Sequence, residues 1–580
     1  MGEAFEFRHA IEFVLLLLLV LAAAWPLGSA AARLLAPAAG PRPPVWRAPF
    51  AALAAALERP LGAAATQPMG WGAYARALLL FNAIGLVATF ALQRAQGFLP
   101  FNPRGLPAVR WDTALCTAVS FVTNTNWQSY SGEVALSHLV QAGALCVQNF
   151  LSAATGIAAM AALARGLAGR GGEALGNAWS DLIAITVRLL LPLALALALL
   201  LVACGVPQTG RATLEATPLD RSAATAQSIA LGPVASQVAI KQLGTNGGGF
   251  FNANSAHPLE NPTPLSNLLE GVALLALPAG LVLAFGRLAG DRRHGRALLA
   301  TMVLLFVPAA LALVAAESHL PPPLALHGIS AADGALEGKE VRFGAFESAW
   351  WGAATTAASN GSVNAMHDSF TPQGGLVALV LMQLGEVVFG GVGSGVYGMV
   401  LFVLVAVFVA ALMVGRTPEY LGKKVEAHEM RLACVGLLAP ALAVLLGTAV
   451  AAACPFGRAS VANPEAHGFS ELLYAFSSAA NNNGSAFAGL AADQPAWNLL
   501  LALAMAIGRY AVLLPVLALA GSFASKRPAP PGPGTLPTHG ALFVALLAAV
   551  VVLLGALTFV PALLLGPGVD HFALASEGVR

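Results

Sequence analysis

Charged residues are scarce in this chain of 580 residues: Asp, Glu, Lys and Arg make up 10% of it, whereas hydrophobic residues make up 57%. A soluble protein of this length needs far more charge on its surface. The net charge is only +2, and the basic residues are scattered, so the sequence predicts no nucleic-acid partner. Apolar runs long enough to cross a bilayer recur from end to end. The chain is therefore predicted to be a polytopic protein of the lipid bilayer.

Catalytic motifs for ATP hydrolysis are also missing. The chain has no DKTG string with a phosphorylatable Asp, no GxxxxGK[ST] phosphate loop, and no soluble domain large enough to hold either. The five cysteines show no CxxC or Cys/His metal spacing. We expect free thiols, although Cys204 and Cys454 each end an apolar run and leave an external disulfide open. The sequence thus argues against an enzyme and against a transition-metal site.

Ten candidate spans lie at about 11–33, 73–93, 134–163, 181–204, 266–286, 298–316, 375–413, 433–453, 498–522 and 541–565. The first is not read as a signal peptide, because Glu3 and Glu6 precede it and Arg33, Arg42 and Arg47 follow it. Basic residues concentrate in that loop and in every second loop after it. The positive-inside rule then places these loops in the cytoplasm and both termini outside.

Four predicted external segments end in an apolar stretch too short to span, at about 112–122, 228–243, 345–358 and 469–480. Each is followed by a small polar run: "TNTNWQ", "TNGGGFF", "SNGSVN" and "NNGSAF". Aligned on Asn124, Asn246, Asn360 and Asn483, these runs recur about every 120 residues. Non-helical backbone is tolerated at membrane depth only where protein buries it or where it lines a watery cavity. We therefore predict four re-entrant loops around one axis.

The polar runs supply neutral oxygens and no carboxylate. Rings of backbone carbonyls, aided by hydroxyl groups, can replace the hydration shell of a monovalent cation, and glycine lets successive carbonyls turn the same way. The pattern predicts a potassium-type selectivity filter. Its predicted residues are Thr123, Asn124 and Thr125; Thr245, Asn246 and Gly247; Ser359, Asn360 and Gly361; and Asn482, Asn483 and Gly484.

The strings "TNTNWQSYSGE", "GTNGGGFFNANSAHPLENPTP", "ASNGSVNAMHDSF" and "NNNGSAFAGL" closely resemble the potassium-translocating A subunits of bacterial Kdp potassium-transporting ATPases. The resemblance covers essentially the whole chain and includes "GRTPEYLGKK" and "GEVVFGGVGSGVYG". It implies an all-α fold like that of the potassium-transporter superfamily, with four span–loop–span units and one extra helix at each end. The units would be 1–36 (first extra helix), 70–165, 178–290, 296–415 and 431–525 (repeats), and 538–567 (last extra helix).

The resemblance also implies a complex in a bacterial inner membrane. K⁺ would be the transported ion, while the B subunit, a P-type ATPase, would bind ATP and Mg²⁺ and hydrolyse the ATP. The single-span C subunit and the small F subunit would complete the assembly. A self-sufficient potassium channel or ion-coupled symporter of the same architecture stays open from the residues alone.

Several residues near the predicted filter carry further expectations. The family places the counterpart of Gln128 near the ion path, although a packing hydrogen bond is an equal alternative. The stretch 375–413 is about twice the length that the ~30 Å hydrocarbon core needs. We predict that it is broken between Gly390 and Gly398, with Gly391, Gly393 and Gly395 in a loop that the family implies is a gate.

Charged residues within or beside these spans are unusual. Glu386 and Arg509 each stand in an apolar span, where charges are costly and usually functional. We expect them to pair or to act on the ion path, and the family places Glu386 at the start of a tunnel to the ATPase partner. Arg416 either anchors the cytoplasmic end of the broken span or belongs to the gate. Lys241 faces either a carboxylate or water. His257, His367 and Asp368 are expected to hold loops rather than a metal.

Overall fold

The computed structural model describes residues 2–36, 48–172, 174–219, 226–320, 328, 335–529 and 536–577. Arg42 and Arg47 of the predicted cytoplasmic loops lie outside these ranges. Among the described residues, ten helical stretches are long and apolar enough to span a bilayer. They are His9–Leu35, Trp71–Phe98, Val140–Ala168, Ala178–Ala203, Pro264–Leu288, Arg292–Glu317, Ser394–Met413, Ala427–Ala453, Pro495–Ser525 and Ala541–Leu574. The predicted all-α fold with ten membrane spans is confirmed.

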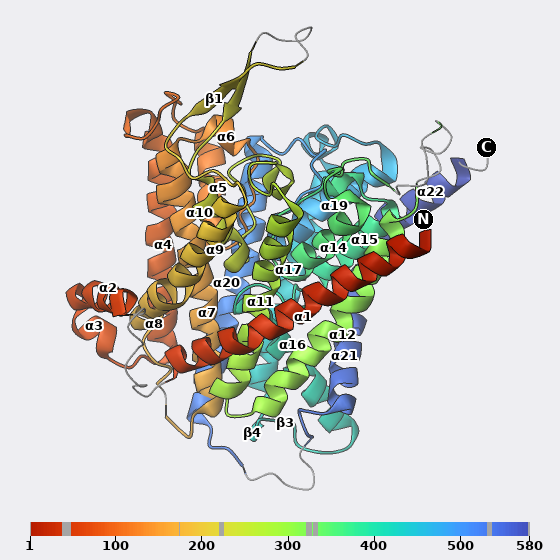
Figure 1. The fold of residues 1–580 in the computed structure, drawn as a ribbon. Coiled ribbons are helices and arrows are strands. Elements are labelled where there is room, and N and C mark those ends of the chain that lie inside the picture. The colour runs from red at the N-terminus through yellow and green to blue at the C-terminus, as the bar shows by residue number, and fades with distance from the viewer. Residues whose placement is uncertain are drawn as a thin grey trace.

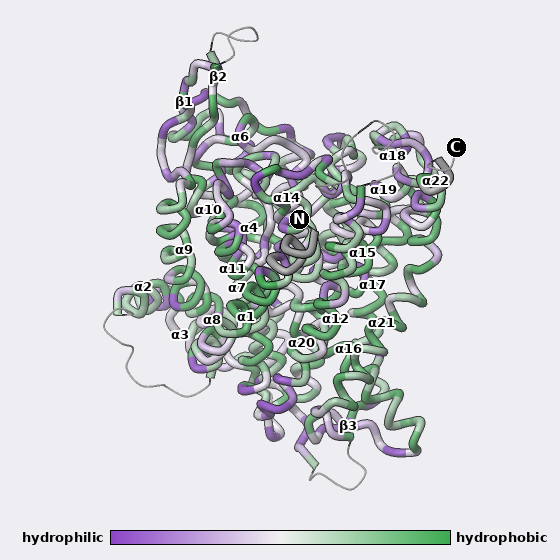
Figure 2. The backbone as a smooth tube through the Cα atoms, turned by 45° about the vertical axis from the view of Figure 1, so that its right-hand side comes forward, coloured by the Kyte–Doolittle hydropathy of each residue, from purple (hydrophilic) through white to green (hydrophobic). Residues whose placement is uncertain are grey.

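These stretches contain most of the helices of the chain. They are α1 (Gly2–Leu35), α4 (Trp71–Ala95), η3 (Gln96–Phe98), η4 (Val140–Cys146), α7 (Val147–Ala168), α8 (Ala178–Ala184), η5 (Ile185–Leu190), α9 (Leu191–Ala203), α11 (Pro264–Leu288), α12 (Arg292–Glu317), α16 (Ser394–Met413), α17 (Ala427–Ala453), α20 (Pro495–Ser525), α21 (Ala541–Leu563), η9 (Leu564–Gly568) and α22 (Val569–Glu577). The turns η4, η5 and η9 are π-helical. Hydrophobic residues dominate these helices, while hydrophilic residues gather towards the two ends of the molecule (Figure 2).

Four further helices do not cross the bundle. They are α5 (Trp111–Val122), α10 (Val234–Leu243), α14 (Gly344–Ala357) and α19 (Glu465–Ala480), here called the pore helices. Three match the predicted half-helices closely. The prediction was wrong for the start of α10, because residues Gln227–Ala230 form strand β2, which pairs antiparallel with β1 (Thr213–Ala216).

Shorter elements connect these helices. They are α2 (Ala48–Glu58), η2 (Arg59–Leu61), α3 (Ala63–Thr66), α6 (Gly132–Ala135), η6 (Asn254–Ala256), η8 (His367–Ser369), α15 (Pro372–Gln383), α18 (Pro455–Arg458) and the hairpin β3 (Glu419–Tyr420) with β4 (Lys423–Lys424). The β1–β2 hairpin and α22 lie at one end of the molecule, here called the upper face, and β3–β4 lies at the opposite, lower face (Figure 1). The first helix also begins towards the upper face.

Small residues let the inner helices pack closely. In α7 and α11, 83% of the most apolar window is buried, against 22% in the first span, so these two helices form the centre of the bundle. A Cβ on Gly28 of α1 would lie 2.4 Å from the carbonyl oxygen of Gly280 in α11. Similarly, Gly166 of α7 lies against the backbone of Ala520 in α20. Such contacts between small residues are how helices associate where lipid removes the hydrophobic driving force.

Candidate functional site: four loops in a ring

After each pore helix, the backbone passes through the same succession of conformations. The capping residues have φ between −98° and −82° with ψ near zero; they are Thr123, Gly244, Ala358 and Asn481. The next residue has a positive φ in every loop: Asn124 (65°), Thr245 (47°), Ser359 (52°) and Asn482 (60°). These four define what we call the first filter position. Four non-glycine residues share a strained conformation at equivalent places, which is typical of a functional backbone.

The second and third positions repeat as well. At the second position, an N–H donates to the carbonyl five residues earlier: Thr125 to Ser120, Asn246 to Lys241, Asn360 to Thr355, and Asn483 to Ser478. At the third position φ is again positive, in Asn126 (57°), Gly247 (83°), Gly361 (82°) and Gly484 (102°). The four loops therefore share one conformation over three residues.

This equivalence corrects the predicted alignment of the first loop. The sequence alignment matched Thr123–Asn124–Thr125 with Thr245–Asn246–Gly247. The structure matches Asn124–Thr125–Asn126 instead, because Thr123 caps α5 as Gly244 caps α10. The string "TNTN" fits either register, and only the end of the helix decides between them. Asn126 is thus a filter-loop residue that the sequence alignment missed.

The four loops contact one another in a closed ring. A Cβ on Gly247 would lie 1.9 Å from the carbonyl oxygen of Asn360, one on Gly361 would lie 2.1 Å from that of Asn483, and one on Gly484 would lie 1.9 Å from that of Thr125. Each third-position glycine therefore faces the second-position carbonyl of the following loop. No side chain fits there, which explains why glycine occupies these positions.

Side-chain hydrogen bonds connect every neighbouring pair of loops. The Asn124 amide donates to Thr245 O (2.8 Å), that of Asn360 to Lys241 O (3.1 Å), that of Asn483 to Thr355 O (2.9 Å), and that of Asn482 to Thr125 Oγ1 (2.9 Å). With the loops numbered 1 to 4 in chain order, each together with its pore helix, these bonds join 1 to 2, 2 to 3, 3 to 4, and 4 to 1. Two of the acceptors, Lys241 O and Thr355 O, lie in the last turns of α10 and α14. The amides use their donors on the neighbouring loop, so they brace the ring rather than face an ion with N–H groups.

The pore helices also shape the electrostatic field at the ring. All four end directly before the first filter position, so the negative ends of four helix dipoles lie next to it. Each helix C-terminus carries the equivalent of roughly half a negative charge. The ring is therefore suited to a cation although its three positions contain no carboxylate.

Gln128 acts within this loop assembly. Its amide donates to Gly249 O (3.2 Å) and accepts from Gly249 N–H (2.8 Å). It also donates to the Tyr130 hydroxyl at 3.3 Å. The side chain thus holds loop 2 to loop 1 just beyond the filter positions.

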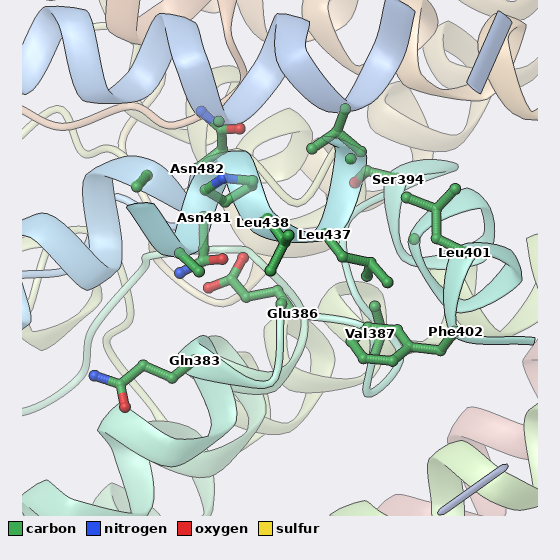
Figure 3. Close-up of a pocket in the computed structure, with 18 of the residues that line it drawn as sticks. Gln383, Glu386, Val387, Ser394, Leu401, Phe402, Leu437, Leu438, Asn481 and Asn482 are labelled. Carbon is green, nitrogen blue, oxygen red and sulfur yellow. The ribbon is translucent and has the colours of Figure 1, made fainter. Parts of the chain in front are cut away.

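A cavity of about 230 Å³ lies below the ring. Its lining includes the first-position residues Asn124, Ser359 and Asn482, and it continues between α16, α17, α20 and α21. Figure 3 shows Glu386, Gln383, Asn481 and Asn482 around one end of it, with Leu401, Phe402 and Leu437 along its apolar side. The cavity therefore joins a polar end at the ring to an apolar passage between helices.

Glu386 and Arg509 both line this cavity but form no ion pair. Among the described residues, neither carboxylate oxygen of Glu386 has a hydrogen-bond partner, and the residue is buried. Arg509 donates from Nη2 to Ser152 O at 2.8 Å, while its Nε has no partner there. Of the two alternatives left open by the sequence, pairing of the two residues is not seen. A buried carboxylate is costly, and the polar side chains nearest to that of Glu386 are those of Ser359 and Asn483 in the ring.

The predicted break of the long span is present but begins earlier. Residues 384–393, between α15 and α16, form a non-helical segment, here called the break loop. Glu386 therefore lies in this loop and not in a helix, whereas Gly395 and Gly398 lie in the first turns of α16. The apolar string "EVVF" gave no sign of it, but Glu386 and Phe389 have positive φ of 47° and 61°.

The break loop lies directly against the ring. Val392 N–H donates to Thr245 Oγ1 (2.9 Å), and Gly390 N–H donates to Ala357 O at the end of α14 (3.1 Å). A Cβ on Gly391 would lie 3.4 Å from that of Ser359, and one on Gly393 would lie 2.2 Å from Gly156 O in α7. The loop therefore occupies the space immediately below the first filter position.

The remaining predicted residues lie farther from the ring. Arg416 follows α16 at the lower face and is exposed; it lines a separate cavity of about 340 Å³. His257 stacks on Phe251, and His367 bonds the Tyr474 hydroxyl at 2.8 Å. Asp368 accepts from His467 (3.2 Å) and Asn463 (3.2 Å). Cys204 and Cys454 are both free thiols.

Known proteins resemble the chain over nearly its whole length. The family model "Potassium-transporting ATPase A subunit" matches residues 14–572. The chain belongs to this family. A relative from Anaeromyxobacter dehalogenans, named "Potassium-transporting ATPase potassium-binding subunit", is 61% identical over 95% of this chain and 96% of its own. A relative of the same name from Methylibium petroleiphilum is 56% identical over 98% of this chain and 99% of its own.

A solved structure is also similar in part. The potassium transporter TrkH from Vibrio parahaemolyticus has 17% sequence identity and a TM-score of 0.46, over 76% of this chain and 85% of its own.

Proposed function

We propose that this chain is the potassium-binding and translocating subunit of an ATP-driven potassium uptake complex. The observation that carries the proposal is the closed ring of four loops with equivalent backbone conformations. The family and the names of the relatives support potassium as the ion. The ring binds K⁺ from the upper face through its backbone carbonyls, aided by the hydroxyls of Thr125, Thr245 and Ser359. The units 70–165, 178–290, 296–415 and 431–525 are the proposed repeats around this pore.

The ring selects by fixed geometry. Dehydrated K⁺ needs several oxygens at once, and backbone carbonyls supply them only if the loops keep their spacing. The asparagine bonds between neighbouring loops and the Gln128–Gly249 contact maintain that spacing. The helix C-termini stabilise the cation in the ring. A carboxylate within the ring would instead bind the cation too tightly to release it.

Transport continues through the cavity below the ring. We propose that the break loop is a gate, because it fills the space below the first filter position and is bonded to Thr245. Glu386 receives the cation at the entrance of the passage between helices. Arg509 opposes its unassisted escape, and Arg416 anchors α16 at the lower face.

Energy must come from a partner, because the chain has no phosphorylatable DKTG string and no phosphate-binding loop. We propose that the B subunit, a P-type ATPase, binds ATP and Mg²⁺, and that the single-span C subunit and the small F subunit complete the complex. The complex would lie in the bacterial inner membrane with the upper face and both termini outside. A self-sufficient channel or symporter is the weaker alternative, since the family is that of an ATPase component.

The substitution Gly247→Asp tests the ring. It puts a charged side chain where a Cβ alone would lie 1.9 Å from the Asn360 carbonyl oxygen. We expect the potassium concentration for half-maximal ATPase activity of the complex to rise at least tenfold, with entry of rubidium or sodium. Unchanged affinity and ion preference would refute the assignment.

A further inference from the structure

Lys241 is unique among the residues that support the filter loops. The residues whose carbonyls accept the second-position N–H are Ser120, Lys241, Thr355 and Ser478. Three are small hydroxyl residues, and only loop 2 has a charged side chain at this place. That side chain is fully buried together with its ion-pair partner, Glu260. A buried charge so close to a cation path needs a specific reason.

The two ends of this ion pair hold two parts of loop 2 together. The Lys241 ammonium donates to the Glu260 carboxylate and to Asn254 Oδ1 (2.5 Å). The other oxygen of Glu260 accepts the N–H of Phe251 at 2.9 Å. Phe251 lies two residues after Gly249, the residue that Gln128 binds. The pair therefore links the end of α10 to the part of the loop that leaves the ring.

The backbone of Lys241 reaches the ring itself. Its carbonyl oxygen accepts Asn246 N–H at 2.8 Å and the Asn360 amide at 3.1 Å. The neighbouring Gln242 adds a second connection, since it accepts from Ser362 Oγ (3.0 Å) and donates to Glu270 (2.8 Å). Movement of the Lys241 side chain would thus shift loops 2 and 3 together.

We propose that Lys241 and Glu260 are positioning residues that set the ion selectivity of the ring. The inference rests on the proposed function of the ring as a potassium filter. A buried ion pair contributes little net stability, because desolvation offsets most of its attraction, and apolar replacements are often as stable. Its contribution here is geometric: the ammonium and the carboxylate fix the spacing between α10 and the segment that follows the second filter loop. Without that link, loop 2 adapts to cations of other sizes.

The test is the double variant Lys241→Met with Glu260→Leu in the complete complex. Removing both charges avoids a buried unpaired ion. We expect a melting temperature close to that of the wild type. The potassium concentration for half-maximal ATPase activity should rise at least tenfold, and the ratio of rubidium to potassium affinity should move towards one. Glu260→Gln, measured in parallel, keeps the shape of the site and should give an intermediate shift even if the double variant fails to assemble.

A matched control exists in the same chain. Lys339 and Glu317 form another fully buried pair, 2.8 Å apart, and Glu317 also accepts the N–H of Thr371. Within the described residues this pair makes no bond to the ring, so Lys339→Met with Glu317→Leu should keep both the affinity and the ion preference.

Gly361→Ala separates failure of the ion pair from failure of the filter, because it alters the ring directly. If Gly361→Ala loses selectivity while the Lys241 and Glu260 variants keep it, the pair is only structural and the inference is wrong. If Gly361→Ala also keeps the wild-type ion selectivity, the filter assignment is wrong, and the inference is wrong with it. Equal loss in the Lys339 control would likewise overturn a specific role for Lys241.

Discussion

At the residue scale, Arg509 and Glu386 share a cavity without forming an ion pair. Arg509 instead donates to Ser152 O beside loop 1. A double variant rescues its single variants when the two charges form a direct pair, and these two do not. We therefore expect the effects of Arg509→Gln and Glu386→Gln on the melting temperature of the complex to add, with no rescue in the double variant.

The same residues are expected to matter for transport. Arg509→Gln should fold, yet it should leak potassium or hydrolyse ATP with weaker coupling to uptake, because a cation in the cavity would meet less repulsion. Ion flux in vesicles together with potassium-stimulated ATPase activity checks this. A folded variant with wild-type ATPase activity and no leak would exclude a role of Arg509 in the ion path.

Gly484 provides the most local test of the ring. It combines φ of 102° with a Cβ position 1.9 Å from Thr125 O, so even alanine strains the backbone and pushes loop 1. Gly484→Ala should weaken potassium affinity at least tenfold. Gly210→Ala serves as the control, because nothing lies within 4 Å of its Cβ position, and it should match the wild type. Equal affinities in the two variants would contradict the ring.

At the scale of elements, the break loop should control flux and not ion preference. Two of its amides bond Thr245 of the ring and Ala357 at the end of α14, whereas selection is assigned to the ring itself. Deleting part of residues 387–391 should therefore raise leak or change the transport rate while the order of preferred cations stays the same. Tracer uptake with potassium, rubidium and sodium measures both. Lost preference at normal flux would show that the loop is part of the filter.

His467 joins three elements near the upper face. From α19 it contacts Asp368 of η8 (3.2 Å) and Asp570 of α22 (2.9 Å), and Glu471 lies on the same helix. Burial opposes its protonation, but hydrogen bonds to the two carboxylates outweigh this and raise the pKa of His467 to about 10. Protonated His467 therefore holds α22 against the loop that follows the third filter.

This pKa gives a signed prediction for stability. The pKa of His467 is raised from about 6.5 in the unfolded chain to about 10 in the fold. Its contribution to the free energy of unfolding is therefore complete below pH ~6.5 and is lost as the pH rises through about 10. Wild type should therefore melt above His467→Gln at pH 6, and the two melting temperatures should converge near pH 10. A constant gap between them across this range would mean that His467 acts by packing alone.

The sequence predicts elements better than it predicts the register between them. Hydropathy identified the ten spans, and recurrence identified the four loops. The string "TNTN" allowed two registers, however, and only the cap at Thr123 fixes the first loop. Likewise, "EVVF" carries no glycine or proline that would indicate a break, although Glu386 and Phe389 have positive φ. The break loop is fixed instead by distant contacts, from Val392 to Thr245 and from Gly393 to Gly156.

The contacts that support the ring are even harder to predict from the sequence. Lys241 and Glu260 lie 19 residues apart, with the carboxylate in a loop that has no periodic pattern. Pairing of this kind is set by how the loop folds back, which local sequence does not encode. The sequence likewise left open whether Arg509 and Glu386 pair or act separately, and only the folded arrangement shows that Arg509 bonds Ser152 O instead.

At the scale of the whole molecule, the ring, the cavity and the break loop form the proposed ion pathway. A passive pathway is limited by membrane voltage, since ~2.3 kcal/mol per 100 mV corresponds to roughly fifty-fold accumulation at 1.4 kcal/mol per tenfold. The central claim is that the chain selects potassium for a separate ATPase partner, so its uptake must exceed this limit only when that partner is active.

The direct measurement is potassium accumulation in vesicles at a clamped voltage, with the chain alone and with its ATPase partner and ATP. We predict accumulation well beyond fifty-fold with the partner and ATP, and none beyond the voltage limit with the chain alone. Accumulation past the limit by the chain alone, or equal accumulation with and without the partner, would contradict the account.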